Sequence, residues 1–284
     1  MIVQKYATLT VGRNEEKTIA TCVENILGQS IPPNHVVLVD DGSADNTFKI
    51  MKKYPQCKVI KRRDRGFSAL NSFHLYLLAD AYNMGLRYLR EQKDWDWLLI
   101  IPPDCLISES YIQYVLNGMT NIYGVASGSP ARHKEFEKYK EGVPTGGGMA
   151  INRKVLDYMG GIYPRNNDYE FSVVHCARFL KYEIGRFEAV EYGRERLSGA
   201  KESQPFISWG RGMKDGNYHP LYAFGRIFKE TVLRQNFNKG IKLLVGYMAQ
   251  PSHKYPDYSH FLRKHQQHTI RTGINKVLHK LRLL

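Results

Sequence analysis

Residues 36–47 read Val-Val-Leu-Val-Asp-Asp-Gly-Ser-Ala-Asp-Asn-Thr, and this stretch decides the fold class of the 284-residue chain. Four apolar residues end at the paired carboxylates Asp40 and Asp41, and a Gly42-Ser43 turn leads into residues that favour the start of a helix. A buried parallel strand has this pattern when it delivers acids to the carboxyl edge of a sheet, where open α/β sheets bind ligands. A strand, turn and helix with solvated acids is the simpler interpretation of this stretch alone.

The preceding segment shows the same alternation of strand and helix. Residues 6–11 are expected to form a first strand, and a polar turn follows at 12–16. Between residues 15 and 29, apolar side chains recur on one stripe of a helix: Ile19, Val23, Ile26 and Leu27. This order predicts an α/β fold with a mostly parallel central sheet flanked by helices. The sequence has no glycine-rich phosphate loop here, so carboxylates would have to do part of any nucleotide binding.

Five blocks of the sequence resemble, in this order, the family 2 glycosyltransferases of the GT-A fold. The blocks are residues 10–16 (Thr-Val-Gly-Arg-Asn-Glu-Glu), 29–33, 39–47, 79–85 (Ala-Asp-Ala-Tyr-Asn-Met-Gly) and 146–153. The resemblance covers about residues 5 to 190. It implies an inverting enzyme that moves a sugar from a UDP- or GDP-sugar to the hydroxyl group of a glycan or a lipid-linked acceptor.

The resemblance also implies which residues bind the donor. Asp41 would accept hydrogen bonds from the base of the nucleotide, and Asp40 would orient Asp41 or support the turn. Asn14 would help to hold the same nucleoside. Gly147 and Gly148, together with Gly146, would let the backbone approach the sugar and the acceptor, although three glycines could equally form a loop without a ligand.

The metal site that the resemblance implies is incomplete in this chain. The expected strand at 95–101 ends in Pro102-Pro103-Asp104-Cys105, so Pro102 stands in place of the first aspartate of the family's Asp-x-Asp element. Mg²⁺ and Mn²⁺ retain several water ligands and need only one or two protein carboxylates beside a diphosphate. Asp104 is therefore the predicted ligand of a divalent cation, and the simpler alternative is that it only ends a strand.

The general base of an inverting transfer is expected near residue 168. Residues 160–171 match the family segment that carries this base, and the family's Glu-Asp pair reads Asn167-Asp168 here. Asp168 is the predicted base that takes the proton of the acceptor hydroxyl, and a plain helix cap is the alternative. Glu170 is expected to point elsewhere on the helix. The departures at Pro102 and Asn167 leave open a catalytically degenerate relative that only binds nucleotide sugars.

The positive charge of the chain is concentrated near its C-terminus. Residues 226–284 contain twelve Lys and Arg but only two acids, Glu230 and Asp257, and so carry +10 of the net charge of +14. A change of composition at 195–225 predicts a catalytic domain at 1–200 and a basic, mainly helical extension at 201–284. Two apolar stripes in this extension favour contact with an anionic membrane surface or packing on the catalytic domain. The stripes are Ile241, Leu244, Val245 and Met248, and Ile270, Ile274, Val277, Leu278 and Leu281.

Other features bear on the compartment and on the excluded functions. The four cysteines are scattered, which argues against a zinc site and is typical of a reducing cytosol. The N-terminus lacks the pattern of a signal peptide, and no apolar run approaches the ~20 residues of a membrane span. We expect a cytoplasmic protein, with a peripheral position on the inner face of the membrane as the hypothesis that the basic extension suggests. A nucleic-acid-binding protein is not expected, because the basic residues concentrate on helix faces and no recognition motif occurs.

Overall fold

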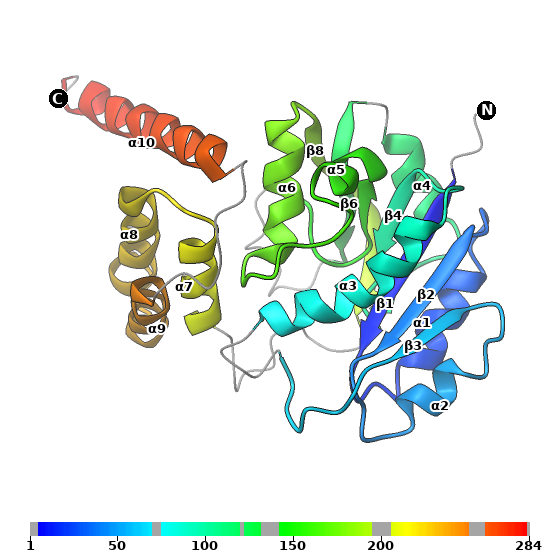
Figure 1. Cartoon of the computed structure of the whole chain (residues 1–284). Coiled ribbons are helices and arrows are strands. Elements are labelled where there is room, and N and C mark those ends of the chain that lie inside the picture. Colours follow the sequence, from blue (N-terminus) through cyan, green and yellow to red (C-terminus); the bar gives the residue numbers. More distant parts are fainter. Residues whose placement is uncertain are drawn as a thin grey trace.

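The computed structural model describes residues 5–69, 75–119, 122–131, 142–194, 206–249 and 259–282, with side chains in the last segment as far as Thr272. These residues form an α/β part, with a central sheet between two layers of helices, and a group of helices from the C-terminal residues at one side of it (Figure 1). The strands are β1 Tyr6–Gly12, β2 His35–Asp40, β3 Lys58–Lys61, β4 Trp97–Ile100, β5 Cys105–Leu106, β6 Tyr123–Pro130, β7 Met149–Asn152 and β8 Glu183–Arg194. The helices of the α/β part are α1 Ile19–Leu27, α2 Thr47–Met51, α3 Tyr76–Glu91, α4 Tyr111–Gly118, α5 Arg153–Tyr158 and α6 Tyr169–Phe179.

The sheet is mixed, with the order β3-β2-β1-β4-β7-β6-β8-β5. Parallel pairing joins β1 to β2 and β4, β2 to β3, and β6 to β8, whereas β7 runs antiparallel to β4 and β6 and β5 runs antiparallel to β8. Most strands therefore point the same way, and the predicted fold class is confirmed. Because β1, β2, β3 and β4 are parallel, the residues that follow them meet at one edge of the sheet.

The two faces of the sheet are covered by two separate hydrophobic clusters. Alternate residues of β1, β2 and β4 enter one cluster with α3, α5 and α6, including Leu9, Val39 and Ile100. The other alternate residues, such as Leu38 and Leu99, enter the second cluster with α1, α2 and α4. Burial on both faces explains why β2 and β4 are continuous apolar runs rather than alternating ones.

Helix α1 begins at Ile19, four residues later than the sequence pattern predicts. The preceding residues are used by a turn instead. The backbone N–H of Glu15 donates to the Thr47 hydroxyl at 2.6 Å, and the Glu16 carboxylate accepts from the N–H of Asn46 at 3.1 Å. These contacts join the turn after β1 to the turn after β2. Glu15 and Glu16 therefore belong to a turn and not to α1.

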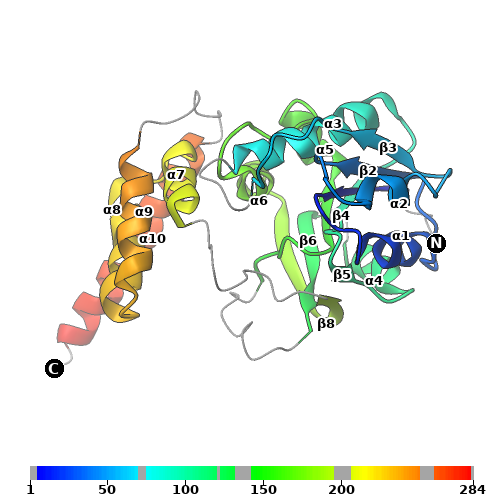
Figure 2. The same cartoon turned by 90° about the horizontal axis from the view of Figure 1, so that it is seen from below.

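The described C-terminal residues are helical. They form α7 Phe206–Asp215, α8 Pro220–Phe228, a short π-helical turn η2 Lys229–Leu233, α9 Phe237–Met248 and α10 Ser259–Arg282. Their buried side chains make a hydrophobic cluster separate from the two of the sheet: Met213, Tyr218, Ala223, Ile227, Leu243, Tyr247 and Leu262. Figure 2 shows α8, α9 and α10 at one side of the molecule, with α7 and α6 between them and the sheet. The predicted boundary near residue 200 falls outside the described residues and stays a prediction.

Among the described helices, none combines the length and the apolar character that a membrane crossing requires. The four cysteines are all buried and free, as their scattered positions in the sequence indicate.

Candidate active site

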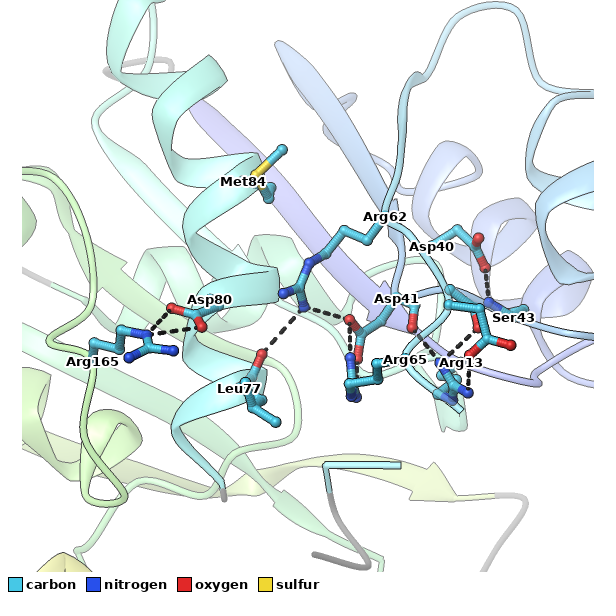
Figure 3. Close-up of polar contacts among 12 residues, drawn as sticks. Arg13, Asp40, Asp41, Ser43, Arg62, Arg65, Leu77, Asp80, Met84 and Arg165 are labelled. Atoms are coloured by element: carbon cyan, nitrogen blue, oxygen red, sulfur yellow. Dashed lines mark hydrogen bonds and ion pairs between the residues drawn. The ribbon is translucent and has the colours of Figure 1, made fainter. Parts of the chain in front are cut away.

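Asp41 lies at the centre of a charged group at the carboxyl edge of the sheet (Figure 3). Its carboxylate is 2% exposed and accepts hydrogen bonds from two arginines that follow β3. Arg65 binds both oxygens, with Nη1–Oδ1 and Nη2–Oδ2 distances of 2.8 and 2.7 Å, and Arg62 donates to Oδ1. Arg62 also donates to the carbonyl of Leu77 at the start of α3. Asp41 therefore fixes two guanidinium groups at the edge where the sequence predicts the nucleotide.

Asn14 and Arg13 hold the two turns of this edge together. Asn14 has a φ of +56°, and its side-chain oxygen accepts from the backbone N–H of Ala44 at 2.9 Å. Arg13 Nη1 donates to the carbonyls of Asp41 and Gly42 at 2.9 and 2.6 Å. The side chain of Asn14 is thus engaged by the turn after β2, and its role in this structure is to shape that turn.

Asp40 is fully buried at the end of β2. One of its oxygens accepts from the N–H of Ser43 at 3.2 Å, whereas the other has no hydrogen-bond partner within the described part of the chain. Its backbone carbonyl accepts from the N–H of Arg62, so the residue connects β2 to the residues after β3. Of the two roles expected for Asp40, the geometry favours support of the turn.

Asp104 follows β4 at the same edge and is half-buried. Pairing of β5 with β8 sets Cys105 opposite Arg194. Burial raises the pKa of the Cys105 thiol to about 12, and Asp104 adds to this rise while Arg194 opposes it, so both charges lie close to that thiol. No group of three His, Cys, Asp or Glu side chains able to hold a metal occurs in the part of the chain described here. A single half-buried carboxylate does not make a preformed metal cage, but it fits a cation that a diphosphate and water would also ligate.

The glycines at 146–148 pack closely against aromatic and acidic side chains. Gly148 has a φ of +59°, and a Cβ there would lie 2.3 Å from the hydroxyl oxygen of Tyr111. A Cβ at Gly147 would lie 2.5 Å from the Tyr192 ring, and one at Gly146 would lie 3.3 Å from Glu170 Oε1. Packing against tyrosines accounts for Gly147 and Gly148, and Gly146 is the glycine that brings the backbone to a carboxylate.

Asp168 immediately precedes α6, but its side chain does not cap that helix. Its carboxylate instead turns toward the C-terminal segment, where a Cβ at Gly216 would lie 2.8 Å from Asp168 Oδ2. The Tyr218 hydroxyl and the positive charge of Arg226 act on the pKa of this carboxyl from the same side. His175 Nε2 lies 3.7 Å from Asp168 Oδ2. Burial raises the pKa of Asp168 well above its usual range and lowers the pKa of His175 to about 3, so His175 is neutral at physiological pH.

Asn167 is explained by a carboxylate from the C-terminal helices. Its side-chain amide donates to Asp215 Oδ2 at 2.8 Å, and its backbone N–H lies 3.2 Å from the same oxygen. All three groups are buried. A glutamate at this position would bring a second carboxylate against Asp215, and like charges at this separation repel strongly away from water. Asp215 therefore explains why this chain has an asparagine at position 167, where the family has a glutamate.

Glu170 points in a different direction from Asp168, toward the glycine loop. Its carboxylate lies beside Gly146, and the Tyr169 hydroxyl donates to it at 3.5 Å. Partial desolvation raises the pKa of Glu170, and the attraction of Arg194 opposes this rise. Asp168 and Glu170 thus lie on different sides of the first turn of α6, Asp168 toward α7 and α8 and Glu170 toward the glycine loop and Arg194.

A sequence comparison identifies the family. The family model described as Glycosyl transferase family 2 matches residues 10–177, more than half of the chain. The chain belongs to this family. The predicted family is confirmed, and the matched segment contains the sheet edge with Asp41 and Asp104 as well as the start of α6.

Individual relatives of this glycosyltransferase are more distant. GlyG, a glycosyltransferase of Streptococcus pneumoniae, is 29% identical over 100 residues, which are 35% of this chain and 30% of GlyG. This chain therefore matches less than a third of the length of that relative.

Two solved structures share the fold. The mannosyltransferase PcManGT of Pyrobaculum calidifontis, in complex with GDP-Man and Mn²⁺, superimposes with a TM-score of 0.54 at 16% identity, covering 96% of this chain and 80% of that one. S. aureus TarS residues 1–349, in complex with UDP-GlcNAc, gives a TM-score of 0.53 at 16% identity and covers 83% and 72%. At these identities the likeness concerns the GT-A fold alone.

Several residues of the glycosyltransferase site were missed by sequence reasoning. Arg62 and Arg65 lie in a charged run directly after β3, at the edge that also carries Asp41. A basic cluster after a parallel strand is a signal that could have found them. No comparable local signal points to Tyr218 and Arg226, which act on the pKa of Asp168 although they lie 50 or more residues further along the chain.

Proposed function

We propose that this glycosyltransferase moves a sugar from a nucleoside diphosphate sugar to an acceptor hydroxyl, with inversion at the anomeric carbon. The observation that carries the proposal is the placement of Asp41, its two arginines and Asp104 at one edge of the sheet, just beyond parallel strands. That edge is where open α/β sheets bind ligands. The donors in two of the solved complexes, GDP-Man and UDP-GlcNAc, support the proposed class of donor.

In this proposal Asp41 acts on the donor through Arg62 and Arg65. Both of its oxygens already accept N–H bonds from these side chains, so the groups presented outward are guanidinium donors. Guanidinium forks match phosphate oxygens and carbonyl oxygens of a base. Phe67, whose ring lies 5.5 Å from the Arg65 guanidinium and is 45% exposed, offers an aromatic face beside them.

Asp104 would hold Mg²⁺ or Mn²⁺ together with the diphosphate. Such a cation, when bound, neutralises charge on the departing nucleoside diphosphate. Mn²⁺ in the PcManGT complex supports this assignment. Arg194, which lies close to Cys105 as Asp104 does, adds a fixed positive charge on the same side.

Asp168 is the proposed general base. The acceptor oxygen would attack the anomeric carbon as its proton passes to Asp168, and the bond to the diphosphate would break on the opposite side, which gives inversion. A raised pKa makes the ionised form of Asp168 a stronger base, and the carboxyl has to be ionised to accept the proton. Tyr218 would fix the orientation of the carboxylate. Glu170, beside Gly146, would bind hydroxyl groups of the sugar or the acceptor.

The proposal is tested by incubating the protein with UDP-GlcNAc or GDP-mannose and Mn²⁺ and measuring the released UDP or GDP. We expect release by the wild type, a loss of about 10²-fold or more in Asp168→Asn, and a smaller loss in Glu170→Gln. Donor binding, measured by thermal shift, should persist in Asp168→Asn. A protein that binds a donor but releases no nucleotide under any of these conditions would be a degenerate binding relative, and the transferase proposal would be wrong.

A further inference from the structure

Helix α9 has apolar side chains on both of its sides, but only one side is covered. Leu243 and Tyr247 are buried in the cluster of the C-terminal helices. On the other side, Ile241, Val245 and Met248 are 60%, 55% and 69% exposed. Exposed apolar side chains that gather on one side of a helix mark an interaction surface. The outer side of α9 is therefore a surface that a partner would cover.

Helix α8 carries a second exposed apolar stripe. Leu221, Phe224 and Phe228 recur at helical spacing and are 65%, 46% and 57% exposed. The Phe224 ring lies 5.7 Å from the ring of Tyr247, so α8 packs beside the covered side of α9. We call the six exposed residues of these two stripes the α8–α9 face. Exposed apolar side chains gathered on neighbouring helices mark an interaction site.

The charges around the α8–α9 face are of one sign. Residues 206–249 contain two acids, Asp215 and Glu230, and both are buried. Asp215 binds Asn167, and Glu230 pairs with Arg234 at 2.7 Å and Lys239 at 2.9 Å. The exposed charges of this segment are positive: Arg226, Lys229, Arg234 and Lys242. Arg226 is two residues from both Phe224 and Phe228 and so lies on the other side of α8, and Arg234 pairs with Glu230. Lys229 and Lys242 are the cations that border the apolar stripes. An apolar stripe with a cationic border and no exposed carboxylate is typical of helices that lie on anionic membranes.

We propose that the α8–α9 face docks on the surface of an anionic lipid bilayer. The apolar side chains would enter the interface between head groups and acyl chains, and the surrounding cations would lie at the level of the head groups. A second copy of the chain fits the face less well, because a symmetric contact would bring the cationic borders of both copies together. The docking does not rest on the proposed transfer reaction, since none of the six apolar residues of the face has a role in that reaction.

The test uses two isoleucines of nearly equal exposure. Ile241 on α9 is 60% exposed, and Ile122, which precedes β6 in the α/β part, is 58% exposed. The full chain, as wild type, Ile241→Glu or Ile122→Glu, is floated with phosphatidylcholine vesicles that contain none or about 30 mol% phosphatidylglycerol. We expect the wild type and Ile122→Glu to float with the anionic vesicles, and Ile241→Glu to bind at least about tenfold more weakly. Binding should fall when salt is raised from about 0.1 to about 0.5 M.

Three further variants measure the contribution of charge to binding and guard against misfolding. Lys242→Gln should weaken binding several-fold at low salt, whereas Lys52→Gln, an exposed lysine in the α/β part, should not. If Ile241→Glu melts well below the wild type, Met248→Ser replaces it, and the same loss is expected. Equal binding by Ile241→Glu and Ile122→Glu, or a wild type that never floats, would overturn the proposal. A wild-type dimer in gel filtration that Ile241→Glu dissociates, without vesicle binding, would assign the face to a second copy instead.

Discussion

Arg65 and Asp41 form a two-pronged ion pair, with Nη1–Oδ1 and Nη2–Oδ2 distances of 2.8 and 2.7 Å, at the carboxyl edge of the sheet. Arg62 completes the group from the end of β3. The carboxylate is almost completely buried, while Arg62 and Arg65 remain 20% and 16% exposed. Asp41 therefore stabilises two cations in a position where a ligand can reach them.

Replacing Asp41 by Asn should weaken both folding and donor binding. The change leaves two guanidinium groups without their anionic partner, and breaking a largely buried ion pair in this way costs about 3 kcal/mol or more. We expect a lower free energy of unfolding in urea and at least about tenfold weaker donor binding by calorimetry. Asp64→Asn is the control, because it removes the charge of an exposed partner of Arg13, while the asparagine oxygen can still accept from the N–H of Gly66. Equal midpoints of unfolding for the two variants would contradict the role given to Asp41.

Asp168→Asn should be inactive and, at neutral pH, at least as stable as the wild type. Burial raises the folded-state pKa of Asp168 above its ordinary value of 3.8. Below pH 3.8 this carboxyl is protonated in both states, and its burial costs little. As the pH rises above that value, the unfolded chain ionises more readily than the folded one, so the wild type loses stability. The advantage of Asp168→Asn should therefore grow as the pH is raised above about 4.

Melting temperatures of both proteins across this pH range measure the effect. His175, whose pKa is lowered to about 3, destabilises the fold as the pH falls below 6.5. Because both proteins retain His175, its contribution largely cancels in the difference. A stability advantage of Asp168→Asn that shrinks with rising pH would show that the carboxylate is held ionised in the fold.

Gly148→Ala should destabilise the protein more than Gly160→Ala. Both glycines have positive φ, +59° and +81°, so alanine would be strained at either position by about 1 kcal/mol. Only at Gly148 would the added Cβ meet a neighbour, the hydroxyl of Tyr111 at 2.3 Å, whereas nothing lies within 4 Å at Gly160. Overpacking adds about 1–3 kcal/mol. Urea denaturation measures both variants, and equal losses would mean that Tyr111 moves aside without cost.

Asp104→Asn should reduce the dependence of nucleotide release on Mn²⁺. Asp104 is the carboxylate that the account assigns to the cation, and the described residues offer no cluster of metal ligands that would replace it. We expect EDTA to stop nucleotide release by the wild type, and Asp104→Asn to need a Mn²⁺ concentration at least about tenfold higher for half-maximal activity. If EDTA left the wild-type activity unchanged, the reaction would not need a divalent cation. The positive charge of Arg194 would then remain to neutralise the diphosphate.

The fold could be predicted from the sequence because its strongest signals are local. β2 and β4 are buried on both faces, which produces continuous apolar runs, and the acids after β2 mark the edge of the sheet. The start of α1 was predicted four residues too early, because Glu15 and Glu16 have helix-forming side chains but are used by the turn at residues 45–47.

The site was only partly predictable, because its electrostatic surroundings come from distant segments. The sequence pointed to Asp41 and Asp104, but the Arg62 and Arg65 partners lie more than 20 residues beyond Asp41. The groups that act on the pKa of Asp168 include Tyr218 and Arg226, and the spacing along α6 carried no sign of these residues. Of the two predicted C-terminal stripes, that on α9 is exposed, while the stripe at 270–281 falls mostly on side chains outside the described part of α10.

Donor turnover by the wild type and Asp168→Asn tests the central claim most directly. Both proteins are incubated with UDP-GlcNAc and with GDP-mannose in the presence of Mn²⁺, and the released nucleoside diphosphate is measured beside donor binding. The account predicts that at least one donor is bound by both proteins and turned over by the wild type, about 10²-fold faster than by the variant. Turnover by Asp168→Asn at the wild-type rate, together with its loss in Glu170→Gln, would contradict the account and assign the base to Glu170.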